Sequence, residues 1–145
     1  MTGALILLAT LVIATAAGLW WRARAGRVRA GGAAPLPADV AAVLDPDAEV
    51  TLVQLSTTFC APCRQTRVLL ADLADRTDGL RHAELDLTDR PGLARELSVL
   101  RTPTTIAVDA RGTELLRVGG VPRPDALLDA LRPHLSHGLD TRPEA

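Results

Sequence analysis

Cys60 and Cys63 are the only cysteines in this chain of 145 residues, and two residues separate them. An apolar, β-prone run (residues 50–55) precedes the pair, and a helix-like stretch (residues 64–76) follows it. At a strand-to-helix junction this spacing places both thiols on one helical turn, with the first near the unpaired N–H groups of the helix start. These groups favour a thiolate, and a thiolate beside a second thiol is the minimum requirement for thiol–disulfide exchange.

The same spacing also occurs in zinc sites and in structural disulfides. Structural zinc needs four ligands, whereas the chain offers two thiols and three scattered histidines, His82, His134 and His137. We expect these histidines to be surface or strand residues, and we expect no metal and no other cofactor. A copper or zinc carrier remains an alternative, although the sequence shows no third ligand near Cys60.

Composition and charge limit the classes of partner. Apolar residues make up 48% of the chain, but one Phe, two Trp and no Tyr imply a core of Leu, Val and Ala. The first 30 residues carry four arginines and no acid, whereas the remainder carries a net charge of −5. An acidic body argues against nucleic acid as a partner, because phosphate binding needs a basic face.

The N-terminal segment predicts a transmembrane anchor. Residues 3–21 contain no charge, and as a helix they would extend about 28 Å, close to the hydrocarbon thickness of a bilayer. Trp20 and Trp21 at the end of this run suit a membrane interface. By the positive-inside rule, the arginines that follow place the N-terminus outside and the body in the cytoplasm. These arginines are Arg22, Arg24, Arg27 and Arg29.

A cleaved signal peptide is the competing interpretation of this segment. Residues 14–16 (Ala-Thr-Ala) resemble a cleavage site, but a basic n-region is missing. We divide the chain into an anchor (1–21), a flexible stem rich in Arg, Gly and Pro (22–35), a folded domain (36–136) and a disordered tail (137–145).

Apolar patterning predicts an α/β domain with the order β-α-β-α-β-β-α. This order predicts a mixed sheet with helices on both faces, parallel wherever helices cross over and antiparallel in the last hairpin. We expect Pro133 to end or distort the last helix. Helices are predicted over 37–44, 64–76, 89–97 and 125–135, and strands over 50–56, 80–87, 104–109 and 113–118, with a turn at 109–112.

Three segments of the predicted domain resemble the thioredoxin family. They are residues 58–64 (Thr-Phe-Cys-Ala-Pro-Cys-Arg), 101–104 (Arg-Thr-Pro-Thr) and 118–120 (Val-Gly-Gly). The similarity extends over about residues 36–135 and does not include the anchor. It implies a thioredoxin-like fold with a central mixed sheet of four to five strands flanked by helices.

The resemblance implies a role for each matched residue. Cys60 would attack, Cys63 would resolve, and the two would form the redox disulfide. Pro103 would be the cis-proline whose loop aligns an extended substrate strand. Gly119 would line the same groove, or serve as a bulge glycine. The implied substrate-binding residues are Phe59 (a contact or a packing residue), Ala61, Pro62 (which stiffens the turn), Thr102 (through its backbone), Pro103 and Gly119.

Four positions depart from the family pattern. Phe59 replaces a tryptophan and Ala61 replaces a glycine. Gln54 aligns with a buried acid that is thought to help deprotonate the second cysteine, and Glu84 aligns with its lysine partner. Deprotonation of Cys63 would then rely on Glu84, on water or on the departing substrate thiolate, and we expect slower turnover.

Together these features predict a membrane-tethered thiol–disulfide oxidoreductase that reduces partner disulfides. We expect protein disulfide substrates, an upstream electron donor and a monomeric soluble domain. Two alternatives remain: an extracytoplasmic reductase of the cytochrome-c-maturation kind, with opposite topology, and a binding or scaffold module whose redox chemistry is incidental.

Overall fold

A five-stranded mixed sheet forms the centre of the domain in the computed structural model, which describes residues 2–32 and 35–136. The strand order is β1-β5-β4-β2-β3, with β2 and β3 parallel and the other neighbours antiparallel. The mixed sheet predicted from the sequence is therefore confirmed, but only its first helical crossover joins parallel strands, because β4 is antiparallel to β2. The strands are β1 (Val28–Ala30), β2 (Val50–Ser56), β3 (Leu80–Asp86), β4 (Thr104–Asp109) and β5 (Glu114–Gly119).

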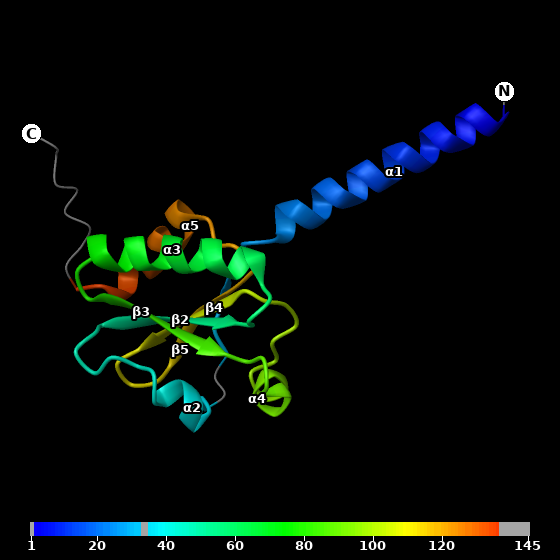
Figure 1. Ribbon diagram of the computed structural model, residues 1–145. Helices are drawn as coiled ribbons and strands as arrows, with labels where there is room; N and C mark the ends of the chain where they lie inside the picture. Colours follow the sequence, from blue (N-terminus) through cyan, green and yellow to red (C-terminus); the bar gives the residue numbers. More distant parts are fainter. Residues whose placement is uncertain (1, 33–34, 137–145) are drawn as a thin grey trace, which may run out of the picture.

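Helices cover both faces of this sheet (Figure 1). On one face, Leu70 and Leu127 from two helices join a single core cluster with the sheet. On the other face, Val40 and Leu93 belong to a second cluster. Each face of the sheet therefore has its own aliphatic core. The helices are α3 (Ala61–Arg76) and α5 (Pro124–Leu131) over the first face, and α2 (Ala38–Ala41) and α4 (Pro91–Glu96) over the second.

Strand β2 runs through the middle of the domain. All seven of its residues are buried. Leu52 contributes to the core cluster under α3, and Val53 to the cluster on the opposite face. Because both faces are covered, apolar side chains of the strand point to both sides of the sheet, as the sequence predicts. Its end at Ser56 directs the following segment towards the cysteine pair.

The hairpin between β4 and β5 agrees with the predicted turn. The Asp109 side chain accepts hydrogen bonds from the backbone N–H groups of Arg111 and Thr113, at 2.9 and 2.8 Å. Gly112 adopts a positive φ of 81°. A short turn with these contacts can join only antiparallel neighbours.

The last helix ends earlier than its apolar pattern suggests. α5 stops at Leu131 and continues as a 3₁₀ turn, η1 (Arg132–His134). Pro133 lies in this turn, and it ends the helix because it has no N–H to donate. The tail 137–145, which was expected to be disordered, lies outside the described residues.

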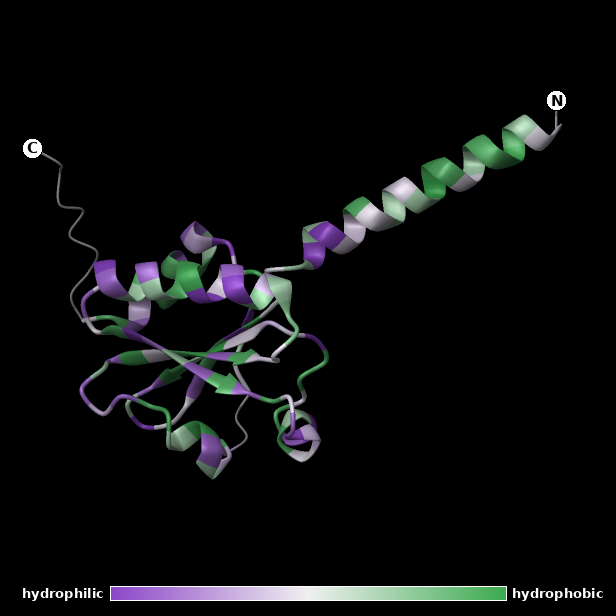
Figure 2. Cartoon of the chain, in the orientation of Figure 1, coloured by the Kyte–Doolittle hydropathy of each residue, from purple (hydrophilic) through white to green (hydrophobic). Residues whose placement is uncertain are grey.

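The N-terminal helix α1 (Thr2–Arg24) projects away from the domain (Figure 1). Its 23 residues extend about 34 Å at 1.5 Å per residue, and none of them is buried. Figure 2 shows that apolar residues dominate α1 until its polar end near the domain. By length and composition, this helix is apolar enough to cross a membrane.

Strand β1 corrects the prediction of a flexible stem over 22–35. Val28 pairs with Val118, and Ala30 pairs with Leu116, antiparallel at the sheet edge. Gly31 adds a backbone hydrogen bond to the carbonyl oxygen of Leu115 at 3.0 Å. Three residues are too few to show an apolar period, and the pairing arises because β5 would otherwise leave its edge groups unpaired.

Candidate active site

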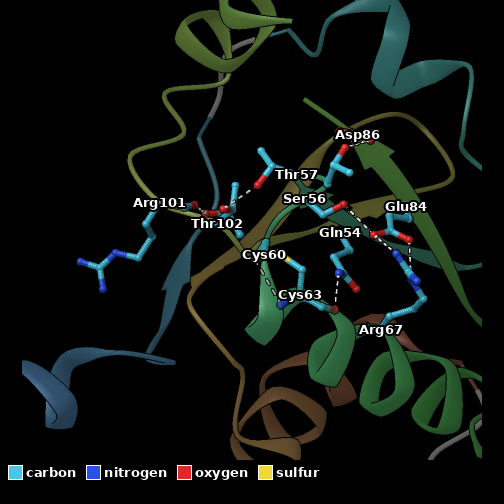
Figure 3. The surroundings of a disulfide bond; sticks show 12 residues. Gln54, Ser56, Thr57, Cys60, Cys63, Arg67, Glu84, Asp86, Arg101 and Thr102 are labelled. Carbon is cyan, nitrogen blue, oxygen red and sulfur yellow. Dashed lines mark hydrogen bonds and ion pairs between the residues drawn. A yellow bond between two sulfur atoms is a disulfide. The ribbon is translucent and has the colours of Figure 1, made fainter. Parts of the chain in front are cut away.

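The two cysteines form a disulfide at the start of α3 (Figure 3). Cys60 is the N-cap residue, and its Sγ accepts a hydrogen bond from the backbone N–H of Cys63 at 3.2 Å. Pro62 lies in the first turn, where a missing N–H costs no helical hydrogen bond. The same N–H and the dipole of the helix start would stabilise a Cys60 thiolate after reduction.

The two sulfurs differ in their access to solvent. Cys60 keeps 9% of its surface exposed and Cys63 keeps 2%. A partner sulfur can therefore reach Cys60 first, with Cys63 behind it. This is the order of attack and resolution that the sequence resemblance implies. Ala61 and Pro62 between them are exposed and border the approach to Cys60.

The Thr102–Pro103 loop lies beside the segment that leads to the disulfide. Its peptide bond is cis, the isomer that the resemblance implies. The hydroxyl oxygens of Thr57 and Thr102 lie 3.4 Å apart and connect this loop to the end of β2. The backbone N–H of Gly120 donates to the carbonyl oxygen of Pro103 at 2.7 Å. The structure thus brings the loop and the end of β5 together near the cysteines.

Gly120, directly after β5, has a backbone conformation that requires glycine, and it was not predicted from the sequence. Gly120 has a φ of 91°, which a residue with a Cβ rarely adopts. A Cβ on the predicted Gly119 would only meet the Arg101 side chain at 3.6 Å, an ordinary contact distance. Gly119 pairs with Thr104 in the sheet and does not line the cavity at the disulfide, so its role in a substrate groove stays a prediction.

Two large apolar side chains near this end of the domain are almost fully exposed. Phe59, directly before Cys60, is 97% exposed, and Leu100, before the Thr102–Pro103 loop, is 96% exposed. Phe59 therefore does not pack in the core, and it is free to contact a partner. Leu100 could not be singled out from the sequence, since one leucine in a short loop carries no periodic signal.

Gln54, at the position where the resemblance implies an acid, contacts the backbone of Cys63. Its side chain is fully buried, and its Nε2 donates to the backbone carbonyl oxygen of Cys63 at 2.9 Å. Its Oε1 is also buried and has no hydrogen-bond partner among the described residues. The amide can hold the second cysteine in place, but an amide does not take up the proton of a thiol at neutral pH.

Glu84 lies opposite Gln54 on the parallel neighbour β3, and it is held by two other residues. Ser56 donates its hydroxyl to Glu84 at 2.6 Å, and Arg67 of α3 binds both carboxylate oxygens at 2.6 and 2.8 Å. The Arg67 hydrogen bond holds the pKa of Glu84 below its ordinary value, against a smaller opposing effect of burial. Glu84 is therefore a carboxylate at neutral pH and a weak proton acceptor.

A polar cavity of about 360 Å³ connects this ion pair to the disulfide. Sequence reasoning missed Ser56 and Arg67 as part of it. Arg67 could have been found, since it follows Cys63 by four residues and so lies on the same face of the helix. The cavity is lined by Ser56, Thr57, Thr58, Cys60, Cys63, Arg64, Arg67, Glu84 and Asp86.

Neither His82 nor His134 lines the cavity at the disulfide. His82 is half-buried on β3, and burial lowers its pKa. His134 is exposed in the 3₁₀ turn η1, and His137 lies outside the described residues. Within residues 2–32 and 35–136, no three His, Cys, Asp or Glu side chains gather as a metal site would require.

No protein-family model matches the chain, but two curated proteins do. A thioredoxin of Staphylococcus saprophyticus is 31% identical over 87 residues, covering 59% of this chain and 83% of that protein. Thioredoxin H2 of Arabidopsis thaliana is 29% identical over 77 residues, covering 53% of this chain and 57% of that protein. This chain therefore spans little more than half the length of the plant relative.

Solved structures show the same fold. A mutant thioredoxin from Halobacterium salinarum superposes with a TM-score of 0.54 at 27% identity, covering 62% of this chain and 78% of that chain. The thioredoxin of Malassezia sympodialis gives a TM-score of 0.54 at 20% identity, covering 72% of this chain and 91% of that chain. The second likeness concerns the fold alone.

The fold and the cysteine site define a thioredoxin-like disulfide oxidoreductase with a redox-active Cys60–Cys63 pair. The chain belongs to the thioredoxin family.

Proposed function

We propose that this protein is a membrane-tethered thiol–disulfide oxidoreductase that reduces the disulfides of client proteins. One observation carries the proposal: the Cys60–Cys63 disulfide lies at the start of α3, beside the cis Thr102–Pro103 loop. The loop offers backbone groups to an extended client strand, and the helix start stabilises the attacking thiolate.

The reaction begins from the reduced pair. The Cys60 thiolate attacks one sulfur of the client disulfide, and the second client sulfur leaves as a thiolate and takes up a proton. Cys63 then loses its proton and attacks the Cys60 Sγ, which releases the first client sulfur. The client gains two electrons and two protons, and the pair is left as the disulfide seen in the structure. An upstream dithiol donor returns the pair to its reduced form.

The residues between the cysteines favour the reducing direction. Ala61 and Pro62 contain no imidazole or other cation that would further stabilise a Cys60 thiolate. The more a thiolate is stabilised, the more oxidising the pair becomes. A reduction potential at or below that of the cytosolic glutathione pool supports this direction, and a potential well above it would contradict it.

Helix α1 supports the membrane tether. It is long and apolar, it buries none of its residues against the domain, and it ends among arginines. With the positive-inside rule, this charge pattern favours a cytoplasmic domain. Fusing alkaline phosphatase or a fluorescent protein to the C-terminus separates this topology from that of an extracytoplasmic reductase of the cytochrome-c-maturation kind.

Trapping tests the catalytic proposal directly. In the full chain, Cys63→Ser leaves Cys60 to attack but removes the resolving thiol, so mixed disulfides with clients should accumulate. Cys60→Ser is the matched control and should trap no client through the attacking position. If Cys63→Ser captures nothing in its native membrane, the oxidoreductase proposal fails. If cellular activity survives Cys60→Ser, a binding or scaffold role is favoured.

A further inference from the structure

Arginines gather in a recess beside the end of α1. The recess has a volume of about 130 Å³ and is separate from the polar cavity at the disulfide. We call it the arginine recess. It is lined by Arg24, Arg27, Arg29, Ser98, Leu100, Arg101, Thr104, Arg117 and Gly119.

Four of these five arginines have no carboxylate partner within the described part of the chain. Arg117 is neutralised, because it makes two hydrogen bonds of 2.8 Å with Glu114. None of the other four forms an ion pair among residues 2–32 and 35–136. The recess therefore carries a local excess of positive charge on a body whose net charge is −5.

Two of the unpaired arginines lie against the tryptophans at the end of α1. The Arg24 guanidinium lies over the Trp20 ring, 3.6 Å from its centroid, and the Arg101 guanidinium lies 5.6 Å from that of Trp21. Arg101 comes from the domain and not from the stem. In Figure 3 its side chain points away from the disulfide. A residue of the folded domain thus reaches the level of the helix end.

Backbone hydrogen bonds connect the recess to the Thr102–Pro103 loop. The N–H of Gly26, two residues after α1, donates to the carbonyl oxygen of Gly119 at 2.9 Å. The next residue, Gly120, donates to the carbonyl oxygen of Pro103 at 2.7 Å. Arg101 precedes the Thr102–Pro103 bond. The recess is therefore next to both the end of α1 and the Thr102–Pro103 loop.

The ligand follows from this position, given the membrane tether of the proposed function on which the inference rests. A helix that ends in tryptophans and arginines places these residues at the headgroup level of a bilayer. Guanidinium groups bind phosphate through paired N–H donors. We propose that the arginine recess binds the phosphate of an anionic phospholipid headgroup and so holds the Thr102–Pro103 loop and the cysteine pair at the bilayer surface.

Charge complementarity gives the binding an orientation. An anionic bilayer repels the acidic remainder of the domain and attracts the recess. The domain is therefore held with its substrate groove near the headgroups. The preferred client is a protein disulfide that lies close to the membrane surface.

Hydrogen exchange in the full-length protein tests the proposal. The chain is placed in nanodiscs of phosphatidylcholine alone, or of phosphatidylcholine mixed with phosphatidylglycerol. Backbone amides of residues 98–102 and 104 should exchange more slowly when phosphatidylglycerol is present, and high salt should remove the difference. The variants Arg29→Gln and Arg101→Gln should each weaken this protection about fivefold, the factor that corresponds to about 1 kcal/mol per arginine near the surface. Arg111→Gln, in the hairpin turn at the other end of β4, is the matched control and should leave it unchanged.

Several outcomes would overturn the lipid site. One is equal exchange in both disc types, and another is a loss of protection in Arg111→Gln as large as in the two recess variants. The others are the same protection when inorganic phosphate is added to phosphatidylcholine discs, and failure of the chain to insert into either disc. Reduction of a soluble peptide disulfide is measured on the same samples. Loss of that activity with retained lipid-dependent protection would count against the proposed function alone, and the reverse result against the lipid site alone.

Discussion

The side-chain amide of Gln54 donates a hydrogen bond of 2.9 Å to the backbone carbonyl oxygen of Cys63. This contact keeps the position of the second cysteine but supplies no group that can take up its proton. The neighbouring carboxylate, Glu84, is already bound by Arg67 and Ser56. Resolution of the mixed disulfide therefore depends on water or on the departing client thiolate.

Placing an acid at position 54 should accelerate that step. Gln54→Glu keeps the size of the side chain and adds a proton acceptor whose pKa is raised by burial. We expect the resolution of a mixed disulfide to become up to about 100-fold faster above that pKa, the lower range for general base catalysis. Stopped-flow kinetics across pH measures this, with Gln54→Leu as the control that removes the hydrogen bond.

The same substitution should destabilise the protein in a pH-dependent way. A buried glutamate at this position has a folded pKa above its unfolded value, so its contribution to stability is present in acid and is lost as the pH rises through the folded pKa. Urea unfolding at several pH values checks this. A pH-independent rate and a pH-independent stability would both contradict a buried, titrating side chain in the Gln54→Glu variant.

The Arg67–Glu84 pair predicts the opposite pH dependence in the natural protein. Arg67 lowers the folded pKa of Glu84 below the unfolded value. The pair therefore stabilises the protein above the ordinary carboxyl pKa, and this stabilisation is lost as the pH falls through the folded pKa. Glu84→Gln should lower the melting temperature by a few degrees at neutral pH and have little effect in acid.

The control for this pair is Asp72→Asn. It breaks the exposed ion pair between Asp72 and Arg76 on the outer side of α3. Exposed pairs of this kind contribute little, so the melting temperature should hardly change. If Glu84→Gln and Asp72→Asn behave alike at every pH, the contacts at Glu84 add nothing beyond surface charge.

Two adjacent glycines should respond differently to alanine. Gly120→Ala forces a side chain into a φ of 91° and should cost about 1–2 kcal/mol of unfolding free energy. Gly119→Ala meets Arg101 only at contact distance and should leave stability nearly unchanged. Denaturant unfolding of the two variants decides this, and equal losses would contradict the distinction.

Phe59 should matter for clients and not for folding. Its side chain is 97% exposed, so Phe59→Ser removes contact area at the approach to Cys60 without opening the core. We expect slower reduction of a protein disulfide and an unchanged melting temperature. Val68→Ser, at a 72% exposed position further along α3, is the control and should alter neither quantity. A fall in stability with Phe59→Ser would mean that the ring packs against the domain.

The sequence was sufficient for features whose signals are local. The β-prone run at residues 50–55, rich in Val and Leu, predicts the buried strand β2. The two cysteines predict the start of the helix that follows. The resemblance implies the cis bond at Pro103. Each of these depends on a few adjacent residues. The fold class follows from their order along the chain.

Features that depend on register between distant segments could not be predicted. The ion pair between Arg67 and Glu84 forms because the register of β3 against β2 places Glu84 opposite Gln54. There the carboxylate lies within reach of Arg67 on α3. β1 was missed because a free strand edge selects it, and no pattern within residues 28–30 does so. The resemblance also identified Gly119 where the backbone needs Gly120.

The pairing of β1 with β5 sets how far an anchored domain can travel. Only residues 25–27 separate the end of α1 from the strand, a span of about 10 Å at full extension. In the membrane-tethered arrangement proposed above, so short a connection would keep the cysteine pair close to the membrane, and the pair would meet clients by lateral diffusion along that surface. For a client in the same membrane, this confinement raises the effective concentration of each partner for the other. Lengthening the chain between Arg24 and Val28 should lower this effective concentration and leave the chemistry of the cysteine pair unchanged.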